Sequence, residues 1–261
     1  MTSQQQVIYS DGMPVGWPYY HMPFELKARM EVILFEADPA VTASLVPEPL
    51  TAHAAGACAL TSLTAESEHW GPFNETFISL ACDLHGTPGF YCLLVCLTDP
   101  RALCAGRETL GVPKVLCEIS GSANLSAWGA GDVTWSTTYD GQEIIRSRTG
   151  DYEAISVDEL PSLLLPLWCL KVIPNPAGGA GPDAIRQLVE LTDEDEVISD
   201  AARTTHVEEV TLSRAVPRTG TVGGIDLTPL RPIAFGDAYR FSLSCLDGLG
   251  KVVHEYGHAS S

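Results

Sequence analysis

The stretch ETFISLACDLHGTPGFYCLLVCLTD, residues 75–99, decides the fold class. It holds two apolar, β-branched runs, 75–84 and 90–99, with turn residues between them. This pattern predicts two consecutive strands, and the chain continues in the same way on both sides. Further strands are expected at residues 29–37, 56–66, 163–174, 206–217 and 237–248, with a hairpin at 132–150 that turns at Asp140-Gly141.

Helical signals are few. A short helix is expected at 38–46, where Asp38 precedes a proline, and two others at 99–111 and 182–191. Strands therefore follow strands without the alternation that marks parallel α/β sheets. The sequence predicts an α+β fold, a mostly antiparallel curved sheet or open barrel around a cavity. No linker divides the chain, so residues 1–261 are expected to form one domain.

Charge and composition exclude several classes of protein. The formal net charge of −18 argues against nucleic-acid binding, which requires basic patches. No apolar stretch reaches the roughly 18 residues of a membrane helix, and no signal peptide is recognisable. We therefore expect a cytoplasmic protein without a membrane segment. Its eight cysteines lie mostly in strand-like runs, which favours reduced, buried thiols. The acidic stretch ELTDEDE (190–196) is expected to be a solvated surface segment.

Lys114 stands in the apolar run GVPKVL (111–116), although the chain has only four lysines. A free lysine titrates near 10.4 and is protonated at neutral pH. Burial in an apolar pocket can lower its pKa, and a neutral amine can attack a ketone to form a Schiff base. Lys171, in WCLKVIP, has a similar setting. Local apolarity alone therefore does not choose between the two lysines.

The C-terminal HEYGH (254–258) matches the H-E-x-x-H pattern of zinc metalloproteases. That pattern requires a helix that places both histidines on one face. Gly257 weakens a helix here, and KVVHEY is typical of a strand. We therefore expect no metal site.

Three segments together resemble the acetoacetate decarboxylase family. They are LVPEPL (45–50), CAGRETLGVPKVL (104–116) and LKVIPNPAG (170–178). The resemblance implies a cone-like, mostly antiparallel β-barrel around an apolar cavity with a few flanking helices. It also implies a homo-oligomer, and Lys114 as the lysine that forms the Schiff base, with Lys171 in a structural role.

The same resemblance implies two further site residues. Glu75 matches an acidic residue that orients substrate or moves a proton, and Arg29 is the nearest match to an arginine that binds the substrate carboxylate. Arg29 lies one residue out of the ungapped register. Two positions depart from the decarboxylases: Val115 replaces a second lysine, which leaves burial to depress the pKa of Lys114, and Leu60 replaces a second glutamate.

These residues predict a lysine Schiff-base lyase that acts on a small-molecule keto acid. The preferred reaction is decarboxylation of a β-keto acid, acetoacetate-like or a larger biosynthetic one. The alternative is aldolase-dehydratase chemistry on pyruvate or another 2-keto acid by the same imine. An alternative of another class is a barrel that binds a small molecule without catalysis. No cofactor is expected, because the imine itself accepts electrons.

Overall fold

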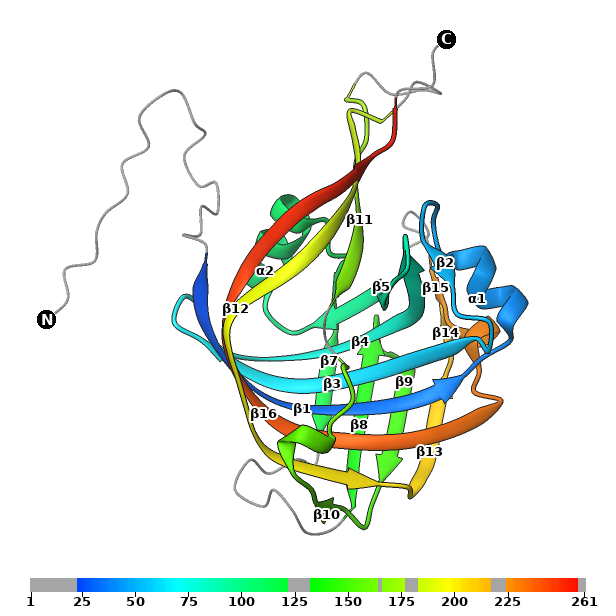
Figure 1. Ribbon diagram of the computed structural model, residues 1–261, viewed down its shortest axis with the longest axis vertical. Coiled ribbons are helices and arrows are strands. Elements are labelled where there is room, and N and C mark those ends of the chain that lie inside the picture. The colour runs from blue at the N-terminus through cyan, green and yellow to red at the C-terminus, as the bar shows by residue number, and fades with distance from the viewer. Residues whose placement is uncertain (1–22, 122–131, 164–165, 177–182, 217–223, 258–261) are drawn as a thin grey trace, which may run out of the picture.

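The computed structural model describes residues 23–121, 132–163, 166–176, 183–216 and 224–257. Long, curved strands dominate these residues, and a few short helices flank them (Figure 1). The α+β class and the curved sheet predicted from the sequence are confirmed. The described part of the chain contains no helix with the length and apolar character that a membrane crossing requires.

The main sheet of the described residues runs in the order β2-β4-β3-β1-β16-β12-β11-β5-β6, with β10 beside β12. β4 also pairs with β5, so the sheet curves back on itself. Neighbouring strands are antiparallel except where β5 meets β11 and β6. The strands are β1 (Phe24–Glu36), β2 (Thr51–Ala52), β3 (Ala57–Ser67), β4 (Gly71–Leu84), β5 (Thr87–Leu97), β6 (Lys114–Leu116), β10 (Glu153–Ala154), β11 (Leu167–Ile173), β12 (Ile185–Thr204) and β16 (Ala234–Glu255).

A second sheet, in the order β13-β9-β8-β7, packs against the main sheet, and two short strands form a separate pair. These strands are β7 (Glu118–Gly121), β8 (Val133–Tyr139), β9 (Gln142–Thr149), β13 (Val207–Leu212), β14 (Arg214–Ala215) and β15 (Ile225–Asp226). The helical segments are α1 (Pro39–Leu45), α2 (Pro100–Ala105), the π-helical turn η1 (Gly106–Leu110), and the 3₁₀ turns η2 (Val157–Glu159) and η3 (Thr228–Leu230). In Figure 1, α2 lies beside the upper part of β12.

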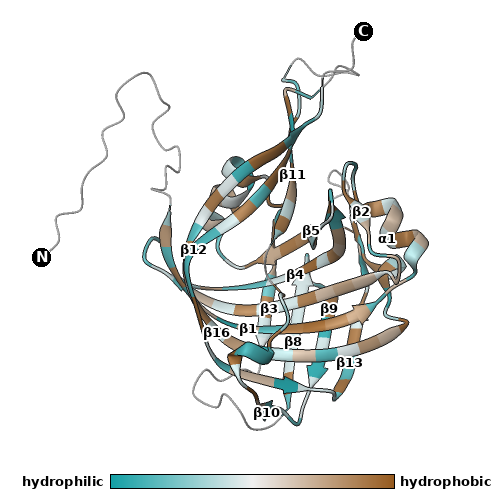
Figure 2. Ribbon diagram, in the orientation of Figure 1, coloured by the Kyte–Doolittle hydropathy of each residue, from teal (hydrophilic) through white to brown (hydrophobic). Residues whose placement is uncertain are grey.

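The two faces of the main sheet bury separate apolar clusters. Along β1, Ile33 and Phe35 join a cluster shared with the second sheet, whereas Phe24 and Met30 join a cluster near α2. Successive side chains of a strand point to opposite faces, so the odd and even positions of β1 serve different clusters. Hydrophobic and hydrophilic residues accordingly alternate along several of the long strands (Figure 2).

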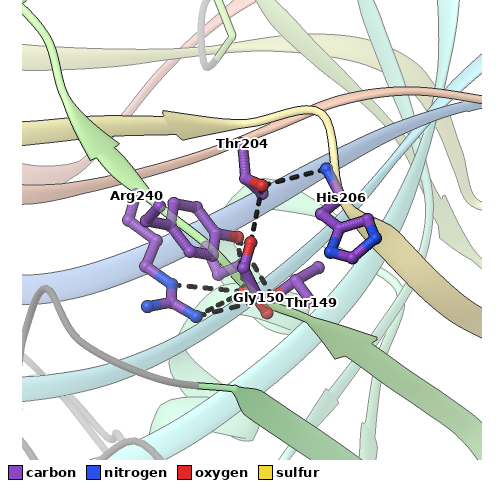
Figure 3. A network of polar contacts seen from close by, with 7 residues as sticks. Thr149, Gly150, Thr204, His206 and Arg240 are labelled. Carbon is purple, nitrogen blue, oxygen red and sulfur yellow. Dashed lines mark hydrogen bonds and ion pairs between the residues drawn. The ribbon is translucent and has the colours of Figure 1, made fainter.

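A buried polar network joins the two sheets. Glu31 on β1 accepts hydrogen bonds from Thr149 (2.5 Å), Tyr152 (2.8 Å) and Arg240 (3.3 Å). Arg240 also lies over the Tyr152 ring, 3.5 Å from its centroid. Figure 3 shows Arg240 beside Thr149, and Thr204 bonded to both Gly150 and His206. The side chains of Arg240 and Glu31 are only 3% and 2% exposed, so this pair is a fixed element of the fold.

Most elements expected from the sequence are present. Asp38 caps α1 by accepting a hydrogen bond from the backbone N–H of Ala40 at 2.8 Å. The hairpin turns at Asp140-Gly141, whose φ angles of 49° and 73° are both positive, as a two-residue type I′ turn requires. The predicted helix at 99–111 corresponds to α2 followed by η1.

The helix expected at 182–191 is wrong, because this segment begins the long strand β12. Ile185, Leu188 and Val189 have helical spacing in the sequence. In the structure, the register of β12 against β16 shifts between Leu188 and Val189. The extra residue of this shift lies on β16, and β12 stays in register with β11. Leu188 and Val189 therefore point to opposite faces, and both are buried, at 0% and 3% exposure, because both faces of the sheet are covered. The acidic stretch 190–196 also lies in β12, and Asp193 within it is only partly exposed rather than fully solvated.

Candidate active site

An apolar cavity of about 120 Å³ lies between the main sheet and the α2–η1 segment. Its walls are mostly aromatic and aliphatic side chains from several strands. Its ionisable lining residues, besides the thiol of Cys92, are Glu75, Lys114 and Asp247. Three such groups in one small apolar space can exchange protons and hold opposite charges close together. The apolar wall is formed chiefly by Phe24, Leu26, Leu63, Trp70, Phe73, Phe77, Val95, Leu110, Val112, Leu167 and Leu191.

Lys114 and Glu75 meet in this cavity, as expected. Lys114 Nζ donates a hydrogen bond to Glu75 Oε1 at 2.8 Å, and the two side chains are only 14% and 13% exposed. β5 brings them together, because it pairs with β6 through Val95 and Lys114 and with β4 through Leu97 and Glu75. A buried amine and carboxylate in direct contact can pass one proton between them.

Gly106 gives the Lys114 side chain its path into the cavity. A β-carbon at position 106 would lie 2.8 Å from Lys114 Cε and 3.2 Å from Nζ, closer than van der Waals contact allows. The glycine begins η1, a π-helical turn of the kind often found at functional sites. Position 106, the first of the GRE segment (106–108), therefore requires glycine for a steric reason: a larger residue would collide with the Lys114 side chain.

Lys171 supports this turn from outside the cavity. Its Nζ donates to the carbonyl of Thr109 at 2.8 Å, which satisfies an acceptor near the end of η1. Gly111, which follows η1, has φ of 76° and lies so close to the Lys171 backbone that a β-carbon would collide with it. The structure thus separates the two lysines: Lys114 lines the cavity and Lys171 holds the preceding turn.

The charge of Lys114 reflects two opposing influences. Burial has the largest single effect and lowers its pKa, but the charge and hydrogen bond of Glu75, together with the charge of Asp247, raise that pKa above its ordinary value. The expectation that burial leaves Lys114 with a depressed pKa is therefore wrong. Lys114 rests as an ammonium ion, and it must give up a proton before it can act as a nucleophile.

Asp247 is a cavity residue that the sequence analysis missed. Burial raises the pKa of its carboxyl, and the charge of Lys114 and the backbone N–H of Gly248 counteract part of that rise. One signal was available in the predicted strand 237–248. Its alternate residues Tyr239, Phe241, Leu243, Cys245 and Asp247 share one face, and the first four are buried. An acid that continues an apolar face indicates a polar group turned inward.

Arg29 does not join the other two predicted residues. Phe24 and Leu26 on β1 line the Lys114 cavity, whereas Arg29 has the opposite parity and lines a separate groove of about 410 Å³ with Lys27 and Ser242. A shift of one residue along a strand moves a side chain to the other face of the sheet. The cavity-side row of β1 continues instead through Ala28.

The HEYGH segment does not form the helix that a metalloprotease requires, and the strand expected at KVVHEY is present as the end of β16. His254 lies in β16, where it pairs with Leu188 of β12, and His258 lies outside the described residues. Within the described ranges, no cluster of three or more histidine, cysteine, aspartate or glutamate side chains could hold a metal ion.

Comparison with known proteins identifies the family of the chain. The family model described as acetoacetate decarboxylase matches residues 12–217. The chain is 27% identical over 235 residues to "Acetoacetate decarboxylase 1" of Bradyrhizobium diazoefficiens, which covers 86% of this chain and 84% of the relative. It is 28% identical over 194 residues to "Acetoacetate decarboxylase" of Ralstonia nicotianae, with 72% and 75% of the two chains covered.

Solved structures share the fold. One, described under "Structural Studies of Acetoacetate Decarboxylase", has a TM-score of 0.77 at 18% identity and covers 92% of each chain. The biosynthetic enzyme MppR, in complex with a condensation product of pyruvate and imidazole 4-carboxaldehyde, also has a TM-score of 0.77, at 19% identity and with 92% of each chain covered. The protein belongs to the acetoacetate decarboxylase family. It is an acetoacetate decarboxylase-like lyase.

Proposed function

We propose that this enzyme decarboxylates a small β-keto acid through a Schiff base on Lys114. The observation that carries the proposal is the 2.8 Å contact between Lys114 Nζ and Glu75 Oε1 inside an apolar cavity. The amine attacks the keto carbon, water leaves, and a protonated imine forms. The imine then accepts the electron pair of the bond that breaks when carbon dioxide departs.

Glu75 is proposed to accept a proton from the lysine nitrogen and to donate it to the substrate oxygen that leaves as water. Because Lys114 rests as an ammonium ion, its proton first passes to Glu75 along their hydrogen bond. An apolar cavity favours this transfer, because it turns two buried charges into two neutral groups. The protonated Glu75 can then give the proton to the hydroxyl that leaves as water.

The charges around the cavity favour decarboxylation over aldol chemistry. Lys114 is the sole cation among its described lining residues, and Glu75 and Asp247 are both acids. A 2-keto acid keeps its carboxylate through condensation and dehydration, so it requires a lasting counter-charge. A β-keto acid loses its carboxylate as neutral carbon dioxide, and that loss relieves the cost of holding an anion in an apolar space.

The size of the cavity favours a short substrate. An engineered protein cavity of about 150 Å³ holds benzene. The 120 Å³ available here suits a keto acid with a carbon chain about as short as that of acetoacetate. A larger biosynthetic keto acid would require the walls to move apart.

Aldolase-dehydratase chemistry is the second candidate, because MppR was solved with a condensation product of pyruvate and shares this fold. Borohydride trapping distinguishes the candidates. The protein is incubated with acetoacetate or pyruvate and reduced, and the added mass is located by peptide mapping. Carbon dioxide release from acetoacetate is measured in parallel.

The expected result is an adduct on Lys114 with acetoacetate, together with carbon dioxide release, and the loss of both in Lys114→Ala. An adduct with pyruvate alone would favour aldol chemistry. No adduct with either acid would favour the non-catalytic binding barrel.

A homo-oligomer in the cytoplasm is proposed as the state of the enzyme. The projecting ends of β11 and β16 carry apolar side chains that are well exposed: Val172 (42%), Ile173 (39%) and Val252 (45%). Burial of such residues between subunits would remove apolar area from water. Light scattering coupled to size exclusion tests the oligomer, and a mass of one chain would contradict it.

A further inference from the structure

The proposed reaction must add a proton to a substrate carbon after carbon dioxide leaves. The Lys114–Glu75 pair offers no further acid for this step, because both groups act at the imine nitrogen. When carbon dioxide leaves the imine, the bonding electrons form an enamine, and a proton must reach its terminal carbon before the ketone can be released. Glu75 is hydrogen-bonded to the lysine nitrogen, where it serves imine formation. A separate acid inside the cavity would let the two proton transfers proceed independently.

Asp247 is in position to be that acid. It is the third ionisable residue, thiols aside, that lines the same cavity, and it lies on β16, opposite Phe24 of β1, which is another lining residue. It therefore enters from the β1–β16 side, whereas Glu75 enters from β4 and Lys114 from β6. A substrate joined to Lys114 would lie among the three groups.

The local backbone is shaped around Asp247. The register of β12 against β16 passes from Thr192–Leu249 to Glu194–Leu246, so β16 has one extra residue between these pairs. Such a bulge bends a strand and redirects side chains, and bulges are common beside active sites. Gly248, in this extra segment, has a φ of 96° that glycine adopts readily, and its N–H donates to Asp247 Oδ1 at 2.5 Å.

We propose that Asp247 is a catalytic residue that delivers a proton to the substrate carbon after decarboxylation. The inference rests on the proposed function. In the step, the C–C bond to the carboxylate breaks and its electrons form the enamine C=C bond. The C=C electrons then take the proton from the Asp247 carboxyl, which leaves an iminium ion and an Asp247 carboxylate. Water hydrolyses the iminium to the ketone and free Lys114, and Asp247 regains a proton from solvent.

Burial has the largest effect on the acidity of Asp247. Burial and Glu75 raise the pKa of its carboxyl, and Lys114 lowers it, with a net rise. From β12, Asp193 interacts electrostatically with Asp247: burial raises the pKa of Asp193 to about 7, and the charges of Asp247 and Glu196 add to that rise. The α2–η1 residues that line the cavity are uncharged: Ala102, Ala105, Gly106 and Leu110. The net rise in its pKa makes the Asp247 carboxyl a weaker acid than an exposed aspartate, so it holds a proton more readily.

The test separates imine formation from proton transfer to carbon. Acetone, the ketone that acetoacetate would leave, is incubated with enzyme in D₂O, and exchange of its methyl hydrogens is followed by NMR. Exchange requires both the imine on Lys114 and an acid–base group at the carbon. Borohydride trapping of acetone on Lys114 reports the imine alone.

Asp247→Asn is expected to keep trapping at the wild-type level and to slow exchange by about 100-fold or more, the usual effect of losing a general acid. Asp247→Glu should restore part of the exchange. Asp158→Asn is the matched control, since Asp158 is exposed and does not line the cavity, and its exchange should stay within about threefold of wild type.

An exchange rate in Asp247→Asn that equals the wild-type rate would overturn the role of Asp247. So would equal losses of trapping and exchange in Asp247→Asn and Asp247→Glu, because that pattern indicates a damaged site. Failure of the wild-type enzyme to trap acetoacetate or acetone would instead overturn the proposed function on which the inference rests.

Discussion

Gly106 and the side chain of Lys114 are in such close contact that a single added methyl group would displace the lysine. An alanine β-carbon would lie 2.8 Å from Lys114 Cε and 3.0 Å from Cδ. The atoms it meets are the far end of a flexible side chain, so the fold can absorb the change while the amine moves. Gly106, the first residue of the GRE segment, therefore fixes the position of Lys114.

Gly106→Ala is accordingly expected to fold and to lose activity. A displacement of about 1 Å of a reacting group can lower a rate about 100-fold, and we expect a loss of that order in decarboxylation. Gly257→Ala is the matched control, because its added β-carbon meets nothing within 4 Å. Activity is measured as carbon dioxide release, and circular dichroism checks the fold. Full activity in Gly106→Ala would show that Lys114 does not need its present position.

Glu75→Gln should change both the rate and the pH dependence of imine formation. Without its proton acceptor, Lys114 should form the imine roughly 100-fold more slowly at the optimum. Removal of the Glu75 carboxylate also removes the main influence that raises the lysine pKa, so neutral amine should appear at lower pH. The pH profile of borohydride trapping should therefore shift to lower pH as its maximum falls.

The exposed Glu108 provides the control for this change, since Glu108→Gln leaves the cavity charges intact. An unchanged pH profile in Glu75→Gln would mean that Glu75 does not set the charge state of Lys114.

The sequence predicted most of the strands, because alternation leaves a local signal, and it pointed to Lys114 and Glu75 as candidates through the family resemblance. Alternating apolar residues define strands, and the GRE…PK segment marks Lys114. It did not predict the face of Arg29, because resemblance gave the position only to within one residue and a strand changes face at every residue. It did not predict β12 in place of a helix, because Leu188 and Val189 are buried on opposite faces of the sheet, and the segments that cover those faces are distant in the sequence.

Asp247 was missed for a related reason. Its alternation along β16 is visible in the sequence, but its neighbours in the cavity come from β1, β4 and β6. Only tertiary pairing shows that the acid faces Lys114 rather than a different apolar layer.

Arg29→Gln is expected to leave the KM for acetoacetate within about threefold of wild type, because Arg29 does not line the Lys114 cavity. The reason is the strand parity that directs Arg29 into a groove away from Lys114. Steady-state kinetics on the variant and wild type make the measurement. A rise in KM of about tenfold or more would support the carboxylate-binding role that resemblance implied.

Glu31→Gln should strongly destabilise the fold. The change leaves Arg240 buried without its counter-charge, and breaking such a buried pair costs about 3–5 kcal/mol. Glu153→Gln is the matched control, because Glu153 is 69% exposed and pairs with the partly exposed Arg203. That loss should stay below about 1 kcal/mol. Urea unfolding gives both values, and equal losses in the two variants would contradict a structural role for the Glu31–Arg240 pair.

Asp193→Asn should stabilise the protein at pH 8 and have a smaller effect at pH 5. Burial and the neighbouring acids raise the pKa of Asp193 from 3.8 to about 7. Between these values the unfolded state releases the proton and the folded state retains it, so folding stability falls as pH rises from about 4 to about 7. Asparagine removes this penalty, so the gain should be largest above pH 7. Thermal unfolding at the two pH values, with the exposed Asp158→Asn as control, measures the difference. A gain that is the same at pH 5 and pH 8 would show that Asp193 titrates normally in the folded protein.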